Sequence, residues 1–183
     1  MNGRRIKELF FVIDTCLLNL RQRSQAVNQL EKWYRDGLIK LRSTGQLWDE
    51  TKTSSAYHQK ATKYPALFAR SCSEADNEAL CSKISGIIFP KGIKTRNDRI
   101  DVEAIFVAKM WGAIFVTNDG DSKTQPRGVL GSRDRLHREI GVQVMRPEEA
   151  VEIIKRRIAL RDKWELQSAD RESRTVADWC GKD

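Results

Sequence analysis

The chain has 183 residues, with 33 Lys and Arg against 25 Asp and Glu, and a formal net charge of +8 at pH 7. This length predicts one domain with a sizeable buried core and argues against a fibrous or disordered protein. The positive charge favours a polyanionic partner such as nucleic acid.

Cysteine spacing and apolar runs argue against further classes of protein. The four cysteines, Cys16, Cys72, Cys81 and Cys180, include no C-x-x-C pair, so we expect reduced, structural thiols rather than a zinc site. The basic N-terminus is followed by only five apolar residues before Asp14, which is too short a run for a signal peptide. No stretch of about 18 apolar residues occurs, so we expect no membrane span and a cytoplasmic protein.

The first predicted element is a strand, because Leu9 to Ile13 is uniformly apolar, as is typical of a central strand in a parallel sheet covered on both faces. Asp14 and Thr15 follow at its carboxyl end. A helical pattern then runs from about Ser24 to Asp36, and Gly37 occupies the position of a C-cap.

A second β-α junction is predicted next. Leu38 to Leu41 favours a short strand, and Ser43 or Thr44 can cap a helix that carries the acids Asp49 and Glu50. This arrangement again places acid close behind a strand.

Residues 51 to about 97 form a poorly readable insertion. Its first part is polar, and a weakly helical pattern runs from Ala66 to Leu80. Ile84 to Phe89 either finishes a helix or forms a short edge strand, and the basic stretch with Lys91, Lys94 and Arg96 is typical of a loop.

The most informative stretch runs from Arg99 to Asp121. Apolar residues recur at helical spacing after Asp101, which we expect to open a helix that ends at Gly112. Ala113 to Thr117 then predicts a buried strand, and the polar segment from Asn118 to Asp121 follows it. Chemistry in parallel sheets collects outside the carboxyl ends of the strands, so Asp119 lies where a site is expected.

The last third predicts one more α/β unit and a charged helix. We expect a loop to Gly131, a helix from Arg133 to Ile140, and a strand from Val142 to Met145. Pro147 then starts a helix that runs to about Leu166, followed by a polar, frayed tail. The apolar face of this helix can pack either on the domain or on a second copy in a homodimer. That face comprises Val151, Ile154 and Ile158.

Four acids are predicted to meet at one edge of the sheet: Asp14, Glu50, Asp101 and Asp119. Because no Cys/His cluster accompanies them, an all-oxygen pocket of this kind suits Mg²⁺ or Mn²⁺. Two such ions about 3.5 to 4 Å apart can activate water and stabilise the leaving oxygen in phosphodiester cleavage. Unpaired carboxylates would otherwise raise one another's pKa, a conflict that a cation resolves.

Each acid also has a structural interpretation. Asp101 can serve the helix N-terminus, where carboxylates are favoured. Glu50 can be a solvated helix residue, and adjacent Asp49 can take its role. Asp119 and Asp121 can be ordinary turn residues. The joint placement of the acids, rather than any one of them, favours a site.

The sequence resembles the PIN-domain nucleases over about residues 8 to 155. Four segments carry the resemblance: IDT at 13–15, DE at 49–50, DVEAIFVAKMWGAIFVTND at 101–119 and GVQVMRPEEA at 141–150. It implies a three-layer α/β/α fold around a central parallel sheet of four to five strands. Residues 1–150 would form the nuclease domain, with 151–183 as a charged helix and tail of the same unit. Members of this family, including bacterial VapC-type toxins, cut single-stranded RNA with Mg²⁺ or Mn²⁺.

The resemblance also implies roles for individual residues. Catalytic and metal-binding positions fall on Asp14, Glu50, Asp101 and Asp119, and Asp121 matches an auxiliary metal position. Thr15 and Asn118 match positions beside the acids. The basic residues Lys91, Lys94 and Arg96 belong to the insertion, which departs from the family pattern; they are candidates for gripping substrate phosphates, and scattered surface cations explain them equally well.

We therefore predict a metal-dependent endoribonuclease acting on single-stranded RNA. A toxin restrained by a cognate inhibitor protein and an RNA-processing enzyme are both open roles. The main alternative is a non-catalytic PIN-like module that binds RNA or protein. A phosphoacceptor receiver domain also gathers acids, but it should carry a lysine after a later strand, where this chain has Arg146 and Pro147.

Overall fold

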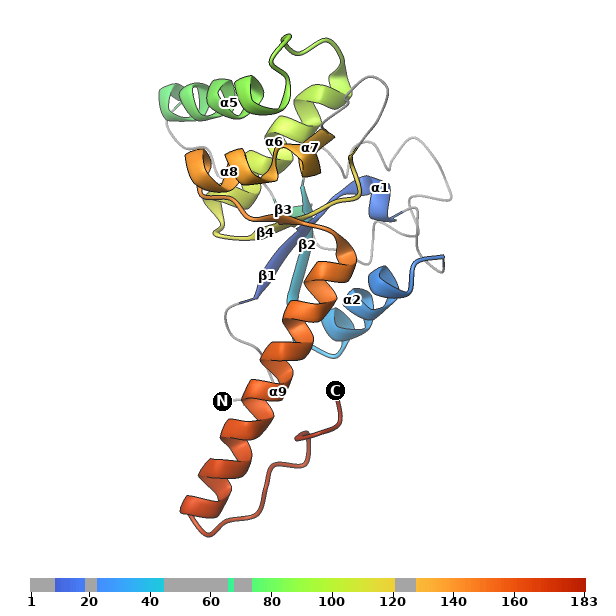
Figure 1. Ribbon diagram of the computed structural model, residues 1–183, viewed down its shortest axis with the longest axis vertical. Coiled ribbons are helices and arrows are strands. Elements are labelled where there is room, and N and C mark those ends of the chain that lie inside the picture. The colour runs from blue at the N-terminus through green and yellow to red at the C-terminus, as the bar shows by residue number, and fades with distance from the viewer. Residues whose placement is uncertain (1–8, 19–22, 45–65, 68–73, 121–127) are drawn as a thin grey trace.

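The computed structural model describes residues 9–18, 23–44, 66–67, 74–120 and 128–183. A five-stranded sheet lies at its centre, with the strand order β3-β2-β1-β4-β5, and every neighbouring pair is parallel (Figure 1). The strands are β1 (Phe10–Ile13), β2 (Lys40–Thr44), β3 (Ala66–Leu67), β4 (Ile114–Val116) and β5 (Val144–Met145).

Helices cover both faces of the sheet, which confirms the three-layer α/β/α class. They are α1 (Thr15–Leu18), α2 (Gln25–Arg35), α5 (Glu74–Ile88), α6 (Arg96–Met110), α7 (Gly128–Gly131), α8 (Arg133–Ile140) and α9 (Pro147–Arg171). Helices α2 and α9 share one buried cluster with the sheet, while α5, α6 and α8 share the other (Figure 1). The arrangement is consistent with a PIN-like fold.

Strand β1 confirms the prediction of a fully covered central strand. Phe11 and Ile13 point into the core under α2 and α9, whereas Val12 points into the core under α6. All three are completely buried. In register, Val12 pairs with Arg42 of β2 on one side and with Phe115 of β4 on the other.

The strand order creates a switch point between β1 and β4. From β1 the chain moves outward to β2 and β3, while β4 and β5 extend the sheet in the opposite direction. The connection after β1 packs α2 on one face, and the connection after β4 packs α8 on the other. In open α/β sheets, ligands bind outside the carboxyl ends of the strands at the point where the connections diverge, which here is between β1 and β4.

Local signals in the sequence explain several helix ends. The Ser24 side chain accepts a hydrogen bond from the Val27 N–H at 3.3 Å and caps α2. Gly37 follows α2 with φ of +72°, a conformation that favours glycine. The helix predicted from Arg133 to Ile140 is confirmed as α8, which ends at Gly141 with φ of +77°.

Other predicted boundaries were wrong. Strand β2 begins at Lys40, two residues after Leu38, and extends through Ser43 and Thr44, which pair with Ala66 and Leu67. Ala66–Leu67 is a strand rather than part of a weakly helical stretch. Residues 128–131, expected in a loop, form α7. The predicted helix carrying Asp49 and Glu50 lies outside the described residues.

Helix α6 also begins earlier than predicted. Thr95 and Asp98 form a capping box, in which the Thr95 hydroxyl accepts from the Asp98 N–H at 3.1 Å and Asp98 accepts from the Thr95 N–H at 3.1 Å. The helix therefore includes Arg96, which was expected in the preceding loop. Asp101 lies in its second turn and does not open it.

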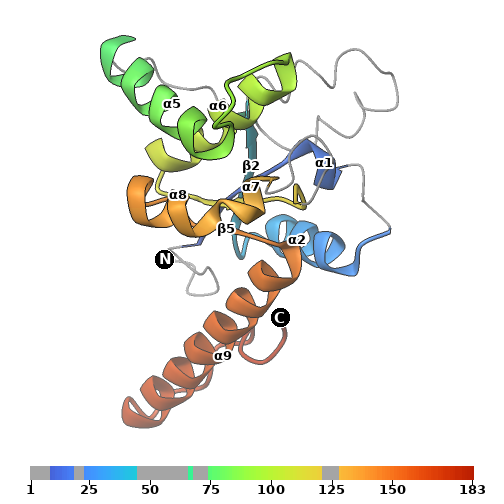
Figure 2. The same cartoon turned by 45° about the horizontal axis from the view of Figure 1, so that its top comes forward.

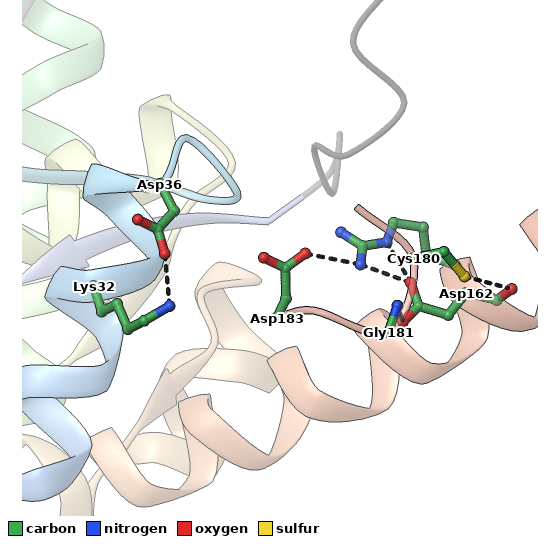
Figure 3. Close-up of polar contacts among 7 residues, drawn as sticks. Lys32, Asp36, Asp162, Cys180, Gly181 and Asp183 are labelled. Carbon is green, nitrogen blue, oxygen red and sulfur yellow. Dashed lines mark hydrogen bonds and ion pairs between the residues drawn. The ribbon is translucent and has the colours of Figure 1, made fainter. Parts of the chain in front are cut away.

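The C-terminal tail is folded back on α9 and is not frayed. The Arg161 side chain bonds to Asp162 and to Asp183, the last residue, at 2.6 and 2.9 Å (Figure 3). Its guanidinium also lies over the Trp179 ring, 4.5 Å from the centroid. Glu165 accepts from Arg174 at 2.6 Å. The tail thereby holds the distal half of α9, residues 159–171, at the end of the helix that runs past the sheet (Figure 2).

The proximal half of α9 packs on the domain. Val151, Ile154 and Ile158 all join the core cluster that contains Phe11 and Leu30. Of the two packing arrangements predicted for this apolar face, the structure therefore shows the one on the domain itself. Nowhere in the described ranges is a helix both long and apolar enough to span a membrane.

Candidate active site

Asp14 and Asp119 lie at the switch point, where β1 and β4 end. The Asp14 N–H donates to the Val116 carbonyl at 3.0 Å, which continues the pairing of these strands by one residue. Asp14 is only 8% exposed although it carries a carboxylate. Asp119 follows β4 by three residues and is half-buried. The sheet therefore brings together two acids that are more than 100 positions apart in the sequence.

Thr117 connects the two acids. Its hydroxyl donates to Asp14 Oδ2 at 2.6 Å and accepts from the Asp119 N–H at 2.9 Å. Thr117 is completely buried, so water does not replace either bond. One hydroxyl therefore fixes the Asp14 carboxylate and the backbone that presents Asp119.

Cys16 supplies further donors to Asp14. Its thiol lies 3.1 Å from Asp14 Oδ2, and its N–H donates to Oδ1 at 3.4 Å. Desolvation and the negative charge of Asp14 raise the pKa of the Cys16 thiol to about 12. The thiol is therefore neutral at physiological pH, and it serves as a hydrogen-bond donor rather than as a nucleophile.

The segment around α7 fixes Asp119 from the opposite side. Val129 N–H donates to Asp119 Oδ2 at 3.0 Å, and Leu130 N–H donates to the Asp119 carbonyl at 3.0 Å. Gly128 makes this approach possible, because it has φ of +51° and a Cβ there would lie 2.7 Å from Gly120 Cα. Asp119 Oδ1 accepts no hydrogen bond from the described part of the chain and is left for a ligand.

The two acids influence each other electrostatically. Desolvation raises the pKa of Asp119, and the negative charge of Asp14 raises it further, while the Val129 N–H acts in the opposite direction. A cation placed against Asp119 Oδ1 would offset this repulsion. The pair therefore has an electrostatic reason to bind a positively charged ligand.

The other predicted site residues lie on several elements of the structure. Asp101 is half-buried in the second turn of α6, and Asn118 is half-buried between Thr117 and Asp119. Thr15 begins α1, but its side chain is not described. Glu50 and Asp121 lie outside the described residues. Lys91, Lys94 and Arg96 are exposed at the α5–α6 connection and the start of α6.

The donor set can be compared with what Mg²⁺ or Mn²⁺ requires. Asp14 and Asp119 offer carboxylate oxygens, the ligand type that these hard cations prefer. Within the residues that the structure describes, no group of three or more His, Cys, Asp or Glu side chains is arranged to hold a metal ion. The pair fits such an ion by chemistry, and a complete ligand set needs water, substrate or further acids.

Sequence analysis assigned no role to Thr117 or Cys16. Both lie next to predicted site positions, one at the end of β4 and one just after β1. A buried hydroxyl two residues before an acid at a strand end was the available signal for Thr117. No family model and no curated protein sequence matches this chain. Membership of the PIN-domain nucleases therefore stays a prediction based on the residues.

Proposed function

We propose that this protein is a Mg²⁺- or Mn²⁺-dependent endoribonuclease that cleaves single-stranded RNA at the switch point of the sheet. The observation that supports the proposal most is the pairing of Asp14 and Asp119 through the buried Thr117 hydroxyl. Desolvation, with a further contribution from the charge of Asp14, raises the pKa of Asp119, so a fixed pair of acids at this position is an unfavourable arrangement in the absence of a cation.

In this mechanism Asp14 and Asp119 hold the metal, with Asp101, Glu50 and Asp121 as further candidate ligands. When bound there, the cation would supply an activated water and stabilisation of the charge on the leaving oxygen. Thr117 and Cys16 keep the Asp14 carboxylate in one orientation by donating to its oxygens. The Val129 N–H orients Asp119 so that Oδ1 is available. Lys91, Lys94 and Arg96 bind phosphates of the RNA.

The test is cleavage of an end-labelled single-stranded RNA in the presence of Mg²⁺. We expect Asp14→Asn and Asp119→Asn each to reduce the rate by at least about a hundred-fold, and excess EDTA to abolish it. Asp36→Asn is a matched control, because Asp36 is an exposed acid that pairs with Lys32 on α2, away from the site. Cleavage at the full rate in EDTA, or by Asp14→Asn, would refute the proposal.

One observation favours a second candidate, a non-catalytic PIN-like binding module. Both oxygens of Asp14 already accept hydrogen bonds from the protein itself. Such a module would bind RNA with equal affinity in the wild type and in Asp119→Asn, and Mg²⁺ would not raise its melting temperature. The nuclease predicts the opposite for Mg²⁺, because the cation offsets the repulsion between the acids.

Metal affinity should also depend on pH in a defined direction. Because the pKa of Asp119 is raised, protons compete with the cation at higher pH than at an ordinary aspartate. Thermal stabilisation by Mg²⁺ should therefore fall as the solution is acidified. Asp119→Asn should remove most of that pH dependence.

A further inference from the structure

The distal half of α9 has an outer face that no part of the described chain covers. Trp164 is 66% exposed on it, more than any other large apolar side chain among the described residues. Leu160 is 43% exposed and lies one turn earlier on the same side. Both belong to the second half of α9, and that end of the helix extends beyond the sheet (Figure 2).

Four exposed cations surround this apolar pair. Arg157 and Arg171 lie on the same side of α9 as Trp164, at helical spacings of seven residues. Arg156 and Lys163 flank Leu160. All four side chains belong to exposed residues, and none has an ion-pair partner in the described residues. We call this set the α9 arm. It comprises Arg156, Arg157, Leu160, Lys163, Trp164 and Arg171.

Two acids in the same part of α9, Asp162 and Glu165, are bound by Arg161 and by the C-terminal tail. Asp162 binds the Arg161 side chain at 2.6 Å and the Gly181 N–H at 3.0 Å (Figure 3). Glu165 binds Arg174 at 2.6 Å and the Ala177 N–H at 2.8 Å. These contacts lie on the side of α9 that continues the buried face. Arg174 of the tail therefore neutralises Glu165, while Arg161 of α9 itself neutralises Asp162, and both acids face away from the cations of the arm.

We propose that the α9 arm binds single-stranded RNA, with a base stacked on Trp164 and phosphates held by the four cations. The proposal rests on the nuclease function argued above. An apolar face alone would fit a protein partner, but four exposed cations around an exposed indole fit a polyanion with flat bases. Single strands expose both features at once.

The arm lies apart from the proposed cutting site. Helix α9 starts directly after β5, and because the strands are parallel, this start lies at the same edge of the sheet as Asp14. Trp164 lies seventeen residues further along, roughly 26 Å from the helix start at 1.5 Å per residue. The arm should therefore strengthen the binding of long RNA and have no effect on an RNA that fills only the site.

The experiment measures fluorescence anisotropy of a labelled, unstructured oligouridylate in EDTA, so that no cleavage occurs. We expect Trp164→Ala to weaken binding about ten-fold, because a stacking residue is lost. Trp164→Phe should retain most of the affinity, and Trp164→Leu should lose it, since leucine keeps apolar area but cannot stack. Trp111→Leu is the matched control, because Trp111 is also exposed but lies at the end of α6.

Salt dependence tests the cations. Arg157→Gln and Arg171→Gln should each flatten the log–log salt slope by about 0.7, the value for one phosphate on a single strand. Lys32→Gln removes the same charge from α2, where Lys32 pairs with Asp36, and should leave the slope unchanged.

The binding results can overturn the proposal in two ways. RNA affinity that is unchanged in Trp164→Ala, or equal to wild type in Trp164→Leu, contradicts base stacking on Trp164. So does a result in which Trp164→Ala abolishes binding to anionic vesicles, or abolishes self-association in sedimentation, without changing RNA binding. The two proposals fail separately: RNA binding in EDTA that depends on Trp164, without any cleavage in Mg²⁺, supports the arm and refutes the nuclease.

Discussion

Replacing Thr117 with valine tests the geometry of the site through protein stability. The substitution keeps the side chain's shape and removes its hydroxyl, which donates to Asp14 at 2.6 Å and accepts from the Asp119 N–H at 2.9 Å. A hydrogen bond to a carboxylate contributes about 1.5–3 kcal/mol, and one from a backbone N–H about 0.5–1.5 kcal/mol. Because Thr117 is completely buried, water cannot restore either bond. We expect the free energy of unfolding to fall by about 2–4 kcal/mol.

Urea unfolding followed by tryptophan fluorescence measures this change, provided that the m-value stays constant. Thr117→Ser is the control, because it keeps both hydrogen bonds and loses one buried methyl, at a cost of about 1 kcal/mol. The order of stability should be wild type, then serine, then valine. If valine is as stable as the wild type, or more stable than serine, the hydroxyl does not link the two acids as described. Valine should also lose the stabilisation by Mg²⁺ that serine retains.

Three further predictions concern the supports of the site and the tail. Gly128→Ala should destabilise the fold by about 1–3 kcal/mol and weaken Mg²⁺ binding, because the added Cβ would lie 2.7 Å from the backbone of Gly120. Gly86→Ala in α5 is the control in the same unfolding assay. It should be neutral or stabilising, because the added Cβ meets nothing within 4 Å. Thr95→Ala should lower stability by about 1 kcal/mol through loss of the α6 cap, and Thr95→Ser should not. The Arg174 hydrogen bond and the Ala177 N–H lower the pKa of Glu165 from 4.5 to about 2. The stability that Glu165 contributes is therefore present above about pH 4.5 and is lost as pH falls towards 2, so the difference between wild type and Glu165→Gln in urea unfolding should shrink over that range.

The two central strands could be predicted because their sequences carry one dominant signal. Leu9 to Ile13 is apolar at every position, and this is possible only where helices cover both faces of the sheet. The same argument applies to β4. Helices α2, α8 and α9 were also predicted, α2 from its helical pattern with Gly37 after its end and α9 from Pro147 at its start.

The errors arose where tertiary contacts override local sequence. Ala66–Leu67 is a strand because it pairs with Ser43 and Thr44, and nothing in two residues predicts a partner more than twenty positions away. The tail was expected to fray because it is polar. It is ordered because Arg161 and Glu165 bind charged and backbone groups that follow α9, and these contacts depend on the chain reversing after Arg171.

The candidate site shows the same division between local signal and tertiary contact. Parallel topology alone placed Asp14 and Asp119 at one edge, because the carboxyl ends of β1 and β4 must meet there. Topology could not say which group would hold the acids in place. Thr117 does so because its position ends a buried strand, where a hydroxyl must find both a donor and an acceptor inside the protein. It finds Asp14 on the neighbouring strand and the Asp119 N–H on its own. Thr117 therefore accounts both for the fixed positions of the two acids and for their repulsion. Its bond holds the Asp14 carboxylate where the negative charge adds to desolvation in raising the pKa of Asp119.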